Sequence, residues 1–232
     1  MKTVDQSFHV PRVPVAVIDC GATGEGLVLR GLLENMGAVV TLHQPGTPGD
    51  FLLVLGQGGG APAFMVICGH GDEHGLIFGD YAPDIDTSCL VQGRLPPRAL
   101  AGKVDLPGRV VLSTACGTGS PEFGKAFIAG GVRAYIAPAS YPDGASALLF
   151  LHHFFHDILC RGAEPEAAYL RARSHDEESA MFKLEGPPSE ARDLMQRRAS
   201  PRCAAWRRAQ AAGSAPRRSI RPGSPGTGST RR

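Results

Sequence analysis

Short apolar runs recur along the chain, and each one stops at glycine, proline or a polar turn. The runs are rich in valine, isoleucine and leucine and do not alternate with polar residues, which is typical of strands buried on both faces of a parallel sheet. We therefore predict strands over Val13–Cys20, Ala38–Leu42, Phe64–Cys68, Arg109–Thr114 and Val132–Ala137.

Stretches with apolar residues at helical spacing separate these runs. In the first such stretch, a helix is predicted by Leu27, Leu29, Leu32, Leu33 and Met36. Further helices are predicted over Pro121–Ala129, Ala145–Cys160 and Glu164–Arg173, while Asp50–Leu55 is too short to distinguish a helix from a strand. Alternating strands and helices predict a three-layer α/β fold, with a mostly parallel central sheet flanked by helices.

Candidate chemistry gathers where two of the predicted strands end. Phe64–Cys68 runs into Gly69-His70-Gly71, and Arg109–Thr114 runs into Ala115-Cys116-Gly117. The carboxyl ends of parallel strands lie along one edge of a sheet, so an imidazole and a thiol are expected on the same rim. A nearby histidine can favour the thiolate and later protonate a leaving amine. His70 and Cys116 are therefore predicted to form a cysteine-nucleophile site.

These two motifs, in the order His then Cys, resemble those of the caspase-hemoglobinase group of cysteine peptidases. Within that group, VVLSTACGTGS at Val110–Ser120 is most similar to the LSAC-x-TG segment of bacterial CHAT-type (caspase-like) domains. Two motifs in the right order and strand context are far more specific than isolated HG or AC pairs. The likeness covers roughly Val13–His175. It implies a caspase-like sandwich that acts as a cysteine endopeptidase on a protein or peptide, without a metal or organic cofactor.

The resemblance also implies roles for the residues of the two motifs. Cys116 is the nucleophile and His70 protonates the leaving amine. The backbone N–H groups of Gly71 and Cys116 form the oxyanion hole, and the missing side chain of Gly71 lets its N–H approach a developing oxyanion. The alternative is a catalytically silent signalling or scaffold module of the same fold. Regulation by a separate protein partner is a further hypothesis.

The resemblance further implies that the loop after the strand beyond Cys116 helps line the pocket for the residue before the scissile bond. This loop is Ala137–Gly144, and its only charged residue is Asp143. A partly desolvated carboxylate would attract an arginine or lysine side chain, which predicts cleavage after a basic residue. Asp143 could equally be a turn residue beside Gly144 or the N-cap of the following helix.

Two other constellations have a simpler interpretation than ligand binding. His152, His156 and Cys160 follow one another at i, i+4 spacing, which can hold zinc. No HExxH carboxylate and no fourth ligand accompany them, so a polar outer face of the helix is favoured. Gly21–Gly26 joins a strand to a helix, as a phosphate-binding loop does, but its spacing is GxxGxG and no lysine closes a P-loop. We therefore predict neither a metal site nor a nucleotide site.

Charge is distributed unevenly along the chain. The net charge is +2, yet the segment from Arg197 to Arg232 contains many arginines and no acidic residue. We predict an N-terminal extension (1–12), a peptidase domain (13–187) and an Arg/Ser/Pro/Gly-rich tail (188–232) that is disordered from about residue 199. Arginines can neutralise phosphates, but Trp206 is the only aromatic residue of the tail, so nucleic-acid binding is not expected.

The N-terminus and the cysteines indicate a cytoplasmic protein. Met1–Arg12 contains no apolar core of a signal peptide, and no run approaches the length of a membrane span. The six cysteines show neither a CxxC motif nor a tight repeated spacing, which favours reduced thiols over a disulfide framework. We expect no association with a membrane.

Overall fold

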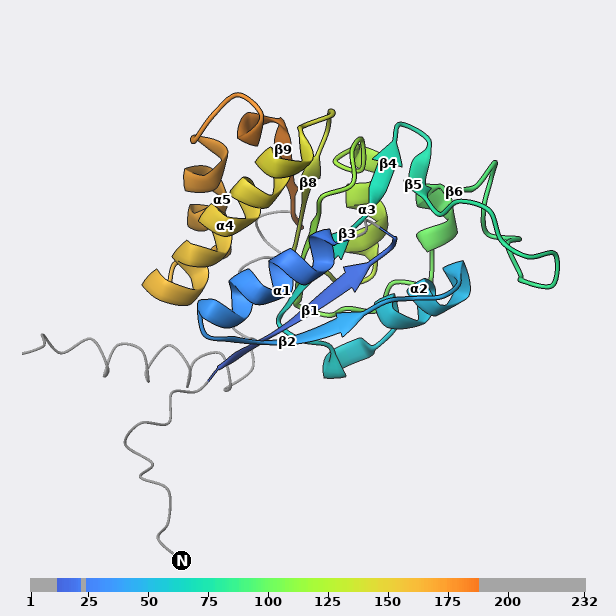
Figure 1. Ribbon diagram of the computed structural model, residues 1–232, viewed down its shortest axis with the longest axis horizontal. Helices are drawn as coiled ribbons and strands as arrows, with labels where there is room; N and C mark the ends of the chain where they lie inside the picture. Colours follow the sequence, from blue (N-terminus) through green and yellow to red (C-terminus); the bar gives the residue numbers. More distant parts are fainter. Residues whose placement is uncertain (1–11, 22–23, 188–232) are drawn as a thin grey trace, which may run out of the picture. The chain divides into compact units, whose positions relative to one another are not determined.

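A six-stranded sheet forms the centre of the computed structural model (Figure 1), which describes residues 12–21 and 24–187. Its strands, in spatial order, are β2 (Ala38–His43), β1 (Val13–Asp19), β3 (Phe64–Cys68), β7 (Val110–Ser113), β8 (Ala134–Pro138) and β9 (Phe182–Glu185). All neighbouring pairs from β2 to β8 are parallel, and β9 runs antiparallel to β8. The mostly parallel sheet predicted from the apolar runs is confirmed.

Helices cover both faces of this sheet. They are α1 (Glu25–Asn35), α2 (Pro48–Leu55), α3 (Pro121–Ala129), α4 (Gly144–Arg161) and α5 (Pro165–Arg173), with the 3-10 turns η2 (Gly58–Gly60), η3 (Pro97–Leu100) and η4 (Ser179–Met181). Phe51 of α2 and Phe123 of α3 share a buried cluster with alternate residues of β1 and β3. On the opposite face, the ring of Phe64 packs edge-on against that of Phe154 of α4. The predicted three-layer α/β architecture is therefore confirmed.

The segment that the apolar pattern leaves ambiguous is the helix α2. Thr47 precedes it in an extended conformation, and its Oγ1 accepts a hydrogen bond from the N–H of Asp50 at 3.1 Å. Pro48 occupies the first helical position, where a missing N–H costs nothing. The cap and the proline begin a helix in a run that is too short to show a period.

Strand β9 is absent from the prediction, whose last element within the domain is the helix now seen as α5. Phe182 is fully buried, and its ring stacks on that of Phe150 at a centroid distance of 3.9 Å. The strand pairs with β8 so that Pro138 lies opposite Phe182. Four residues at the edge of a sheet carry too little alternation to signal a strand, so this element depends on its tertiary contacts.

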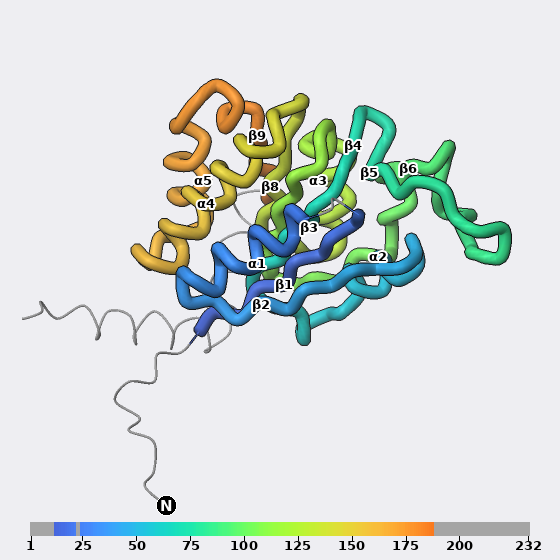
Figure 2. The backbone as a smooth tube through the Cα atoms, viewed as in Figure 1, coloured from blue at the N-terminus to red at the C-terminus, as the bar shows by residue number. Residues whose placement is uncertain are grey.

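A second sheet of three short antiparallel strands extends from the end of β3 (Figure 2). Its strands are β4 (His70–Asp72), β5 (Gly75–Ile77) and β6 (Arg94–Leu95). Asp72 closes the turn between β4 and β5, because its carboxylate accepts hydrogen bonds from the N–H groups of His74 at 2.9 Å and Gly75 at 3.2 Å. Residues 74–79 thus contribute a single strand, β5, which pairs with the strand that carries His70.

Some predictions concern residues outside the described ranges. These are the N-terminal extension up to residue 11 and the tail from residue 188, including its predicted disorder. Within the described ranges, no helix combines the length and the hydropathy that a membrane crossing needs.

Candidate active site

His70 lies just beyond the end of β3, on the first strand of the small sheet. A Cβ atom at the intervening Gly69 would lie 3.2 Å from the Cβ of Cys20, so this exit from the sheet is tightly packed. The backbone of His70 pairs with Ile77, and its side chain is exposed. The imidazole therefore lies at the carboxyl edge of the central sheet, in contact with solvent.

Cys116 lies in the turn that leaves β7, and buried hydrogen bonds hold this turn in shape. Thr118 Oγ1 donates to the carbonyl oxygen of Ala115 at 2.6 Å. Ser113 Oγ accepts a bond from the N–H of Ala115 at 3.2 Å, and the Tyr135 hydroxyl donates to the carbonyl oxygen of Thr118 at 3.0 Å. These bonds fix the backbone around Cys116, whose side chain is half-buried.

The turn after β7 and the start of the small sheet pack backbone against backbone. A Cβ atom at Gly71 would lie 2.5 Å from the carbonyl oxygen of Cys116, and one at Gly117 would lie 2.7 Å from the carbonyl carbon of Asp72. Gly117 also has a φ of +71°, a conformation that residues with a side chain disfavour. Only glycine fits both positions. The structure therefore brings His70, at the start of β4, and Cys116, in the turn after β7, into adjoining segments although they are far apart in the sequence.

The surroundings of Cys116 favour the protonated form of its thiol. Burial raises its pKa, a backbone hydrogen bond within the residue partly opposes this, and the nearby carboxylate of Glu25 raises the pKa further. A preformed ion pair with an imidazolium would lower the pKa instead. That His70 favours the thiolate stays a prediction. Burial raises the pKa of Cys20 to about 12 and that of Cys68 well above its usual range, so neither thiol is a better nucleophile.

Glu25 is a carboxylate near this site that the sequence pattern does not single out. It is the first residue of α1, and burial raises its pKa, while a hydrogen bond to Thr114 opposes the shift. Thr114 directly precedes the turn of Cys116. Glu25 Oε1 is buried and has no hydrogen-bond partner among the residues that the structure describes. In the sequence, Glu25 is simply an acidic residue in the first turn of a helix. Such residues are common because they stabilise helices, so the pattern does not indicate a functional site.

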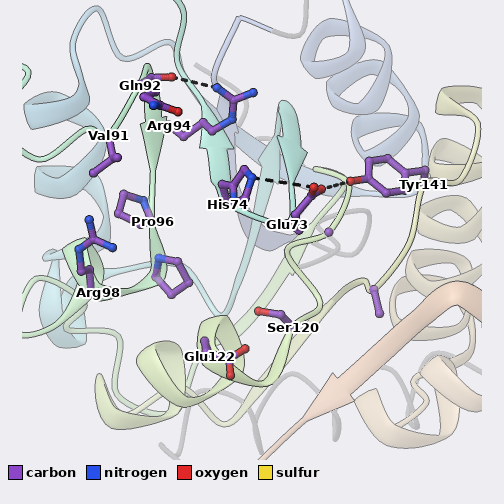
Figure 3. A pocket seen from close by; sticks show the side chains of 13 residues that line it. Glu73, His74, Val91, Gln92, Arg94, Pro96, Arg98, Ser120, Glu122 and Tyr141 are labelled. Atoms are coloured by element: carbon purple, nitrogen blue, oxygen red, sulfur yellow. Dashed lines mark hydrogen bonds and ion pairs between the residues drawn. The ribbon is translucent and has the colours of Figure 1, made fainter.

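A pocket of about 870 Å³ opens beside the turn of Cys116 (Figure 3). Gly117 and Ser120 line it from the connection between β7 and α3, and Glu73 and His74 line it from the turn between β4 and β5. Tyr141 lines it from the loop after β8. The volume lies in the range of sites that hold small ligands or substrate side chains. A side chain held in this pocket would lie next to the turn that carries Cys116.

Glu73 and Tyr141 join the two sides of this pocket. The Tyr141 hydroxyl donates a hydrogen bond to Glu73 Oε2, and His74 Nε2 lies 3.9 Å from Glu73 Oε1 (Figure 3). The bond from Tyr141 lowers the pKa of Glu73 and raises that of Tyr141. Glu73 is therefore ionised at neutral pH, with its charge directed at the space between the two loops. No sequence pattern indicates this contact, because it joins two loops that are distant in the chain.

Of the other charged side chains that line the pocket, one is in an ion pair with a described residue and two are not. Arg94 is paired with Asp72 at 2.5 Å, so it contributes little net charge. Glu122, in the first turn of α3, and Arg98, in η3, form no ion pair with any residue in the described ranges. The pocket therefore presents two carboxylates, Glu73 and Glu122, and one unbalanced guanidinium. In Figure 3, Arg98 lies apart from both carboxylates.

Asp143 is the N-cap of α4. Its carboxylate accepts the N–H of Ala145 at 2.8 Å, and its own N–H donates to Glu178 Oε2 at 2.6 Å. The side chain is exposed and is not among the residues that line the pocket, whereas Ala139 and Tyr141 of the same loop are. The loop Ala137–Gly144 therefore contributes two residues to the pocket lining. Asp143 itself caps α4 and does not line the pocket.

The helical face with His152, His156 and Cys160 lies on α4, at the spacing read from the sequence. Cys160 is exposed and His156 is half-buried. Within residues 12–21 and 24–187, no group of three or more His, Cys, Asp or Glu side chains is arranged to hold a metal ion.

The fold of this chain has relatives among solved structures, although no protein-family model and no curated protein matches the sequence. The Arg-specific cysteine proteinase gingipain R superposes on 79% of this chain and 50% of its own, with 14% identity and a TM-score of 0.50. A complex of the pro- and mature domains of RgpB from Porphyromonas gingivalis superposes with 14% identity, coverage of 76% and 47%, and a TM-score of 0.49. The separase–securin complex of Saccharomyces cerevisiae gives 11% identity, coverage of 78% and 13%, and a TM-score of 0.48.

The likeness to gingipain R concerns the fold. This chain has a caspase-like α/β fold. It spans about half the length of gingipain R, and 14% identity carries the architecture rather than the activity. The function of the site must therefore be argued from its own residues.

Proposed function

We propose that this chain is a cysteine endopeptidase in which Cys116 is the nucleophile and His70 is the general acid–base. The observation that carries the proposal is the close packing of the two strand-end turns, in which Gly71 fits against the carbonyl group of Cys116 without room for a side chain. The caspase-like fold shared with a cysteine proteinase supports it. The adjoining pocket offers space for a substrate side chain.

In the proposed reaction, His70 accepts the Sγ proton of Cys116 as the sulfur attacks the peptide carbonyl carbon. The carbonyl oxygen becomes an oxyanion, which the N–H groups of Gly71 and Cys116 stabilise. When the tetrahedral intermediate collapses, the C–N bond breaks and His70 gives its proton to the leaving amine. Water then attacks the thioester and releases the acid and the free thiol. Because burial raises the pKa of the Cys116 thiol, the reaction requires a base such as His70 to take up the Sγ proton.

Cleavage after a basic residue is the specificity that we propose. Glu73 and Glu122 are carboxylates of the pocket lining, and an arginine or lysine side chain would be held there by charge-assisted hydrogen bonds. We assign the attraction to Glu73 instead of Asp143, because Glu73 faces the pocket while Asp143 caps a helix. The Arg specificity named for gingipain R is in line with this choice.

A fluorogenic peptide library tests the proposal when wild type is compared with Cys116→Ala. Cys160→Ala is the matched control, since Cys160 is an exposed thiol on α4. We expect turnover to fall to background in Cys116→Ala and to persist in Cys160→Ala. Turnover that survives in Cys116→Ala would remove Cys116 from the mechanism. A folded wild type without any turnover would favour the catalytically silent signalling or scaffold module.

Three narrower statements stay predictions from the sequence. They are the particular likeness to CHAT-type domains, the cytoplasmic location and the regulatory protein partner. Pull-down with wild type and with Cys116→Ala tests the last of them, because a regulatory partner would be retained by both, whereas an uncleaved substrate would be retained by the variant alone.

A further inference from the structure

A second pocket, of about 320 Å³, lies in the layer formed by α4 and α5 and is not used by the proposed reaction. Helices α4 and α5 pack against each other, as Figures 1 and 2 both show. The pocket is lined by His152, His153, His156, Asp157, Arg161 and Arg171. Its volume is at the lower end of the range for sites that bind small molecules.

Two arginines of this pocket converge on a single carboxylate. Arg161 donates to Asp157 Oδ1 at 3.1 Å, and Arg171 donates to Asp157 Oδ2. The Asp157 side chain is only 6% exposed, whereas the arginine side chains are 62% and 51% exposed. One carboxylate balances only one of the two positive charges, and each guanidinium keeps further N–H donors. The pocket therefore has a surplus of positive charge and of hydrogen-bond donors.

His153 contributes a polar atom that the described protein groups do not satisfy. Its Nε2 is buried and has no hydrogen-bond partner in residues 12–21 and 24–187. The centroid of its ring lies 4.3 Å from that of His175, which follows α5, and 6.0 Å from that of His152. A buried polar atom without a partner costs free energy. A ligand oxygen that accepted a hydrogen bond from Nε2 would remove this cost.

We propose that this pocket binds a small, soluble phosphate compound, with Arg161, Arg171 and His153 donating hydrogen bonds to its oxygens. A phosphate monoester carries a charge of roughly −1.5 to −2 near neutral pH and offers three strong acceptor oxygens. Arginine suits such a group because its parallel N–H donors match two oxygens at once. The histidines alone would suggest a metal ion, but the surplus positive charge repels a cation, and no metal-holding group occurs among the described residues.

Binding is expected to be coupled to proton uptake. Burial lowers the pKa of His153, and the neighbouring imidazoles of His175, His152 and His156 lower it further, while Asp157 acts in the opposite direction. Arg161 and Arg171 also line this pocket and add to the positive charge. A bound dianion would favour the charged form of His153, because an opposite charge nearby raises the pKa of an imidazole. The affinity should therefore increase as the pH falls through the range in which histidine titrates.

Calorimetric titration of the full chain with pyrophosphate, at about pH 6 and about pH 8, tests this proposal. We expect wild type to bind more tightly at the lower pH. Arg161→Gln and His153→Gln should each weaken this binding by about tenfold or more, because each removes a hydrogen bond to a charged group. Arg30→Gln is the matched control, since it removes the same charge from an exposed ion pair on α1.

Several results would overturn the proposal. One is equal binding by wild type and all three variants, because it would mean that pyrophosphate is attracted by general positive charge, such as that of the Arg-rich tail. Another is the absence of binding by wild type at the lower pH. A third is tighter, Arg161-dependent binding to phosphatidylcholine vesicles that contain phosphatidic acid than to pyrophosphate, which would assign the site to a membrane headgroup. Arg161→Gln leaves Arg171 paired with Asp157, so this variant is expected to fold.

Discussion

A methyl group on Gly71 would lie 2.5 Å from the carbonyl oxygen of Cys116. The contact joins backbone to backbone, so no change of rotamer can relieve it. Strands β3 and β7 are hydrogen-bonded neighbours, with Ile67 opposite Ser113, and their exits therefore begin side by side. The relative position of His70 and Cys116 is thus determined by sheet register and by glycine packing, rather than by a bond between the two side chains.

Replacing Gly117 by alanine should destabilise the protein more than replacing Gly108. Both residues have a positive φ, +71° and +74°, so both variants carry backbone strain of about 1–3 kcal/mol. Only at Gly117 would the new Cβ also meet backbone, at 2.7 Å from the carbonyl carbon of Asp72, whereas the space around Gly108 is open. Urea unfolding of the two variants measures the difference. Equal losses of unfolding free energy would contradict the close packing of the two turns.

Alkylation of Cys116 by iodoacetamide should accelerate as the pH rises and should be faster than that of Cys20 or Cys68. Burial raises the pKa of the Cys116 thiol, so its reactive thiolate is a minor species at neutral pH and grows with each pH unit. Burial raises the pKa of Cys20 to about 12, which keeps that thiol protonated over the same range. Mass spectrometry of the labelled peptides gives each rate. Faster labelling of Cys20 would make the assignment of the nucleophile wrong.

His70→Ala should lower kcat/KM by about 10²–10⁴-fold, the usual contribution of a general acid–base. The fold should survive, because the His70 side chain is exposed at the rim and adds little to the core. His74→Ala is the control, since this imidazole is also exposed and lies on the same hairpin, but it points at Glu73 (Figure 3). If His74→Ala lost activity and His70→Ala kept it, the general acid–base would be His74.

The parallel core could be predicted from the sequence because each of its strands is buried on both faces. Phe64–Cys68, for example, is buried at every position and therefore appears as an unbroken apolar run. The strand β9 could not be predicted in this way. Phe182 is held by stacking on Phe150 and by pairing with β8, and neither contact leaves a local pattern.

The candidate site, too, could be predicted only where its residues belong to a local sequence pattern. His70 and Cys116 could be located from the sequence because each follows the end of a buried strand. The wall of the pocket could not, because the bond from Tyr141 to Glu73 joins two loops that meet only in the folded chain. For Asp143 the sequence left three roles open, as a pocket carboxylate, a turn residue or a helix cap, and the structure shows it capping α4.

Glu73→Gln should reduce cleavage after arginine by about tenfold or more, because it removes the negative charge that strengthens a hydrogen bond from the guanidinium. In the free protein the Tyr141 hydroxyl donates to this carboxylate, and a glutamine oxygen can still accept that bond, so stability should change little. Asp143→Asn is the matched control. It removes one negative charge from the neighbouring loop and keeps the helix cap, because asparagine caps as well as aspartate. The measurement is the initial rate on two substrates, one with arginine and one with glutamine before the scissile bond. This comparison separates the effect of charge from that of size.

The pH dependence of arginine cleavage gives a second measure of the role of Glu73. The hydrogen bond from Tyr141 lowers the pKa of Glu73, so the carboxylate stays charged to a lower pH than an ordinary glutamate. Preference for arginine over glutamine in wild type should therefore persist into mildly acidic solution and decline only when Glu73 is protonated. Tyr141→Phe removes the hydrogen bond, so the decline should move to a higher pH. An unchanged decline in Tyr141→Phe, or a loss of arginine cleavage in Asp143→Asn but not in Glu73→Gln, would transfer the specificity role away from Glu73.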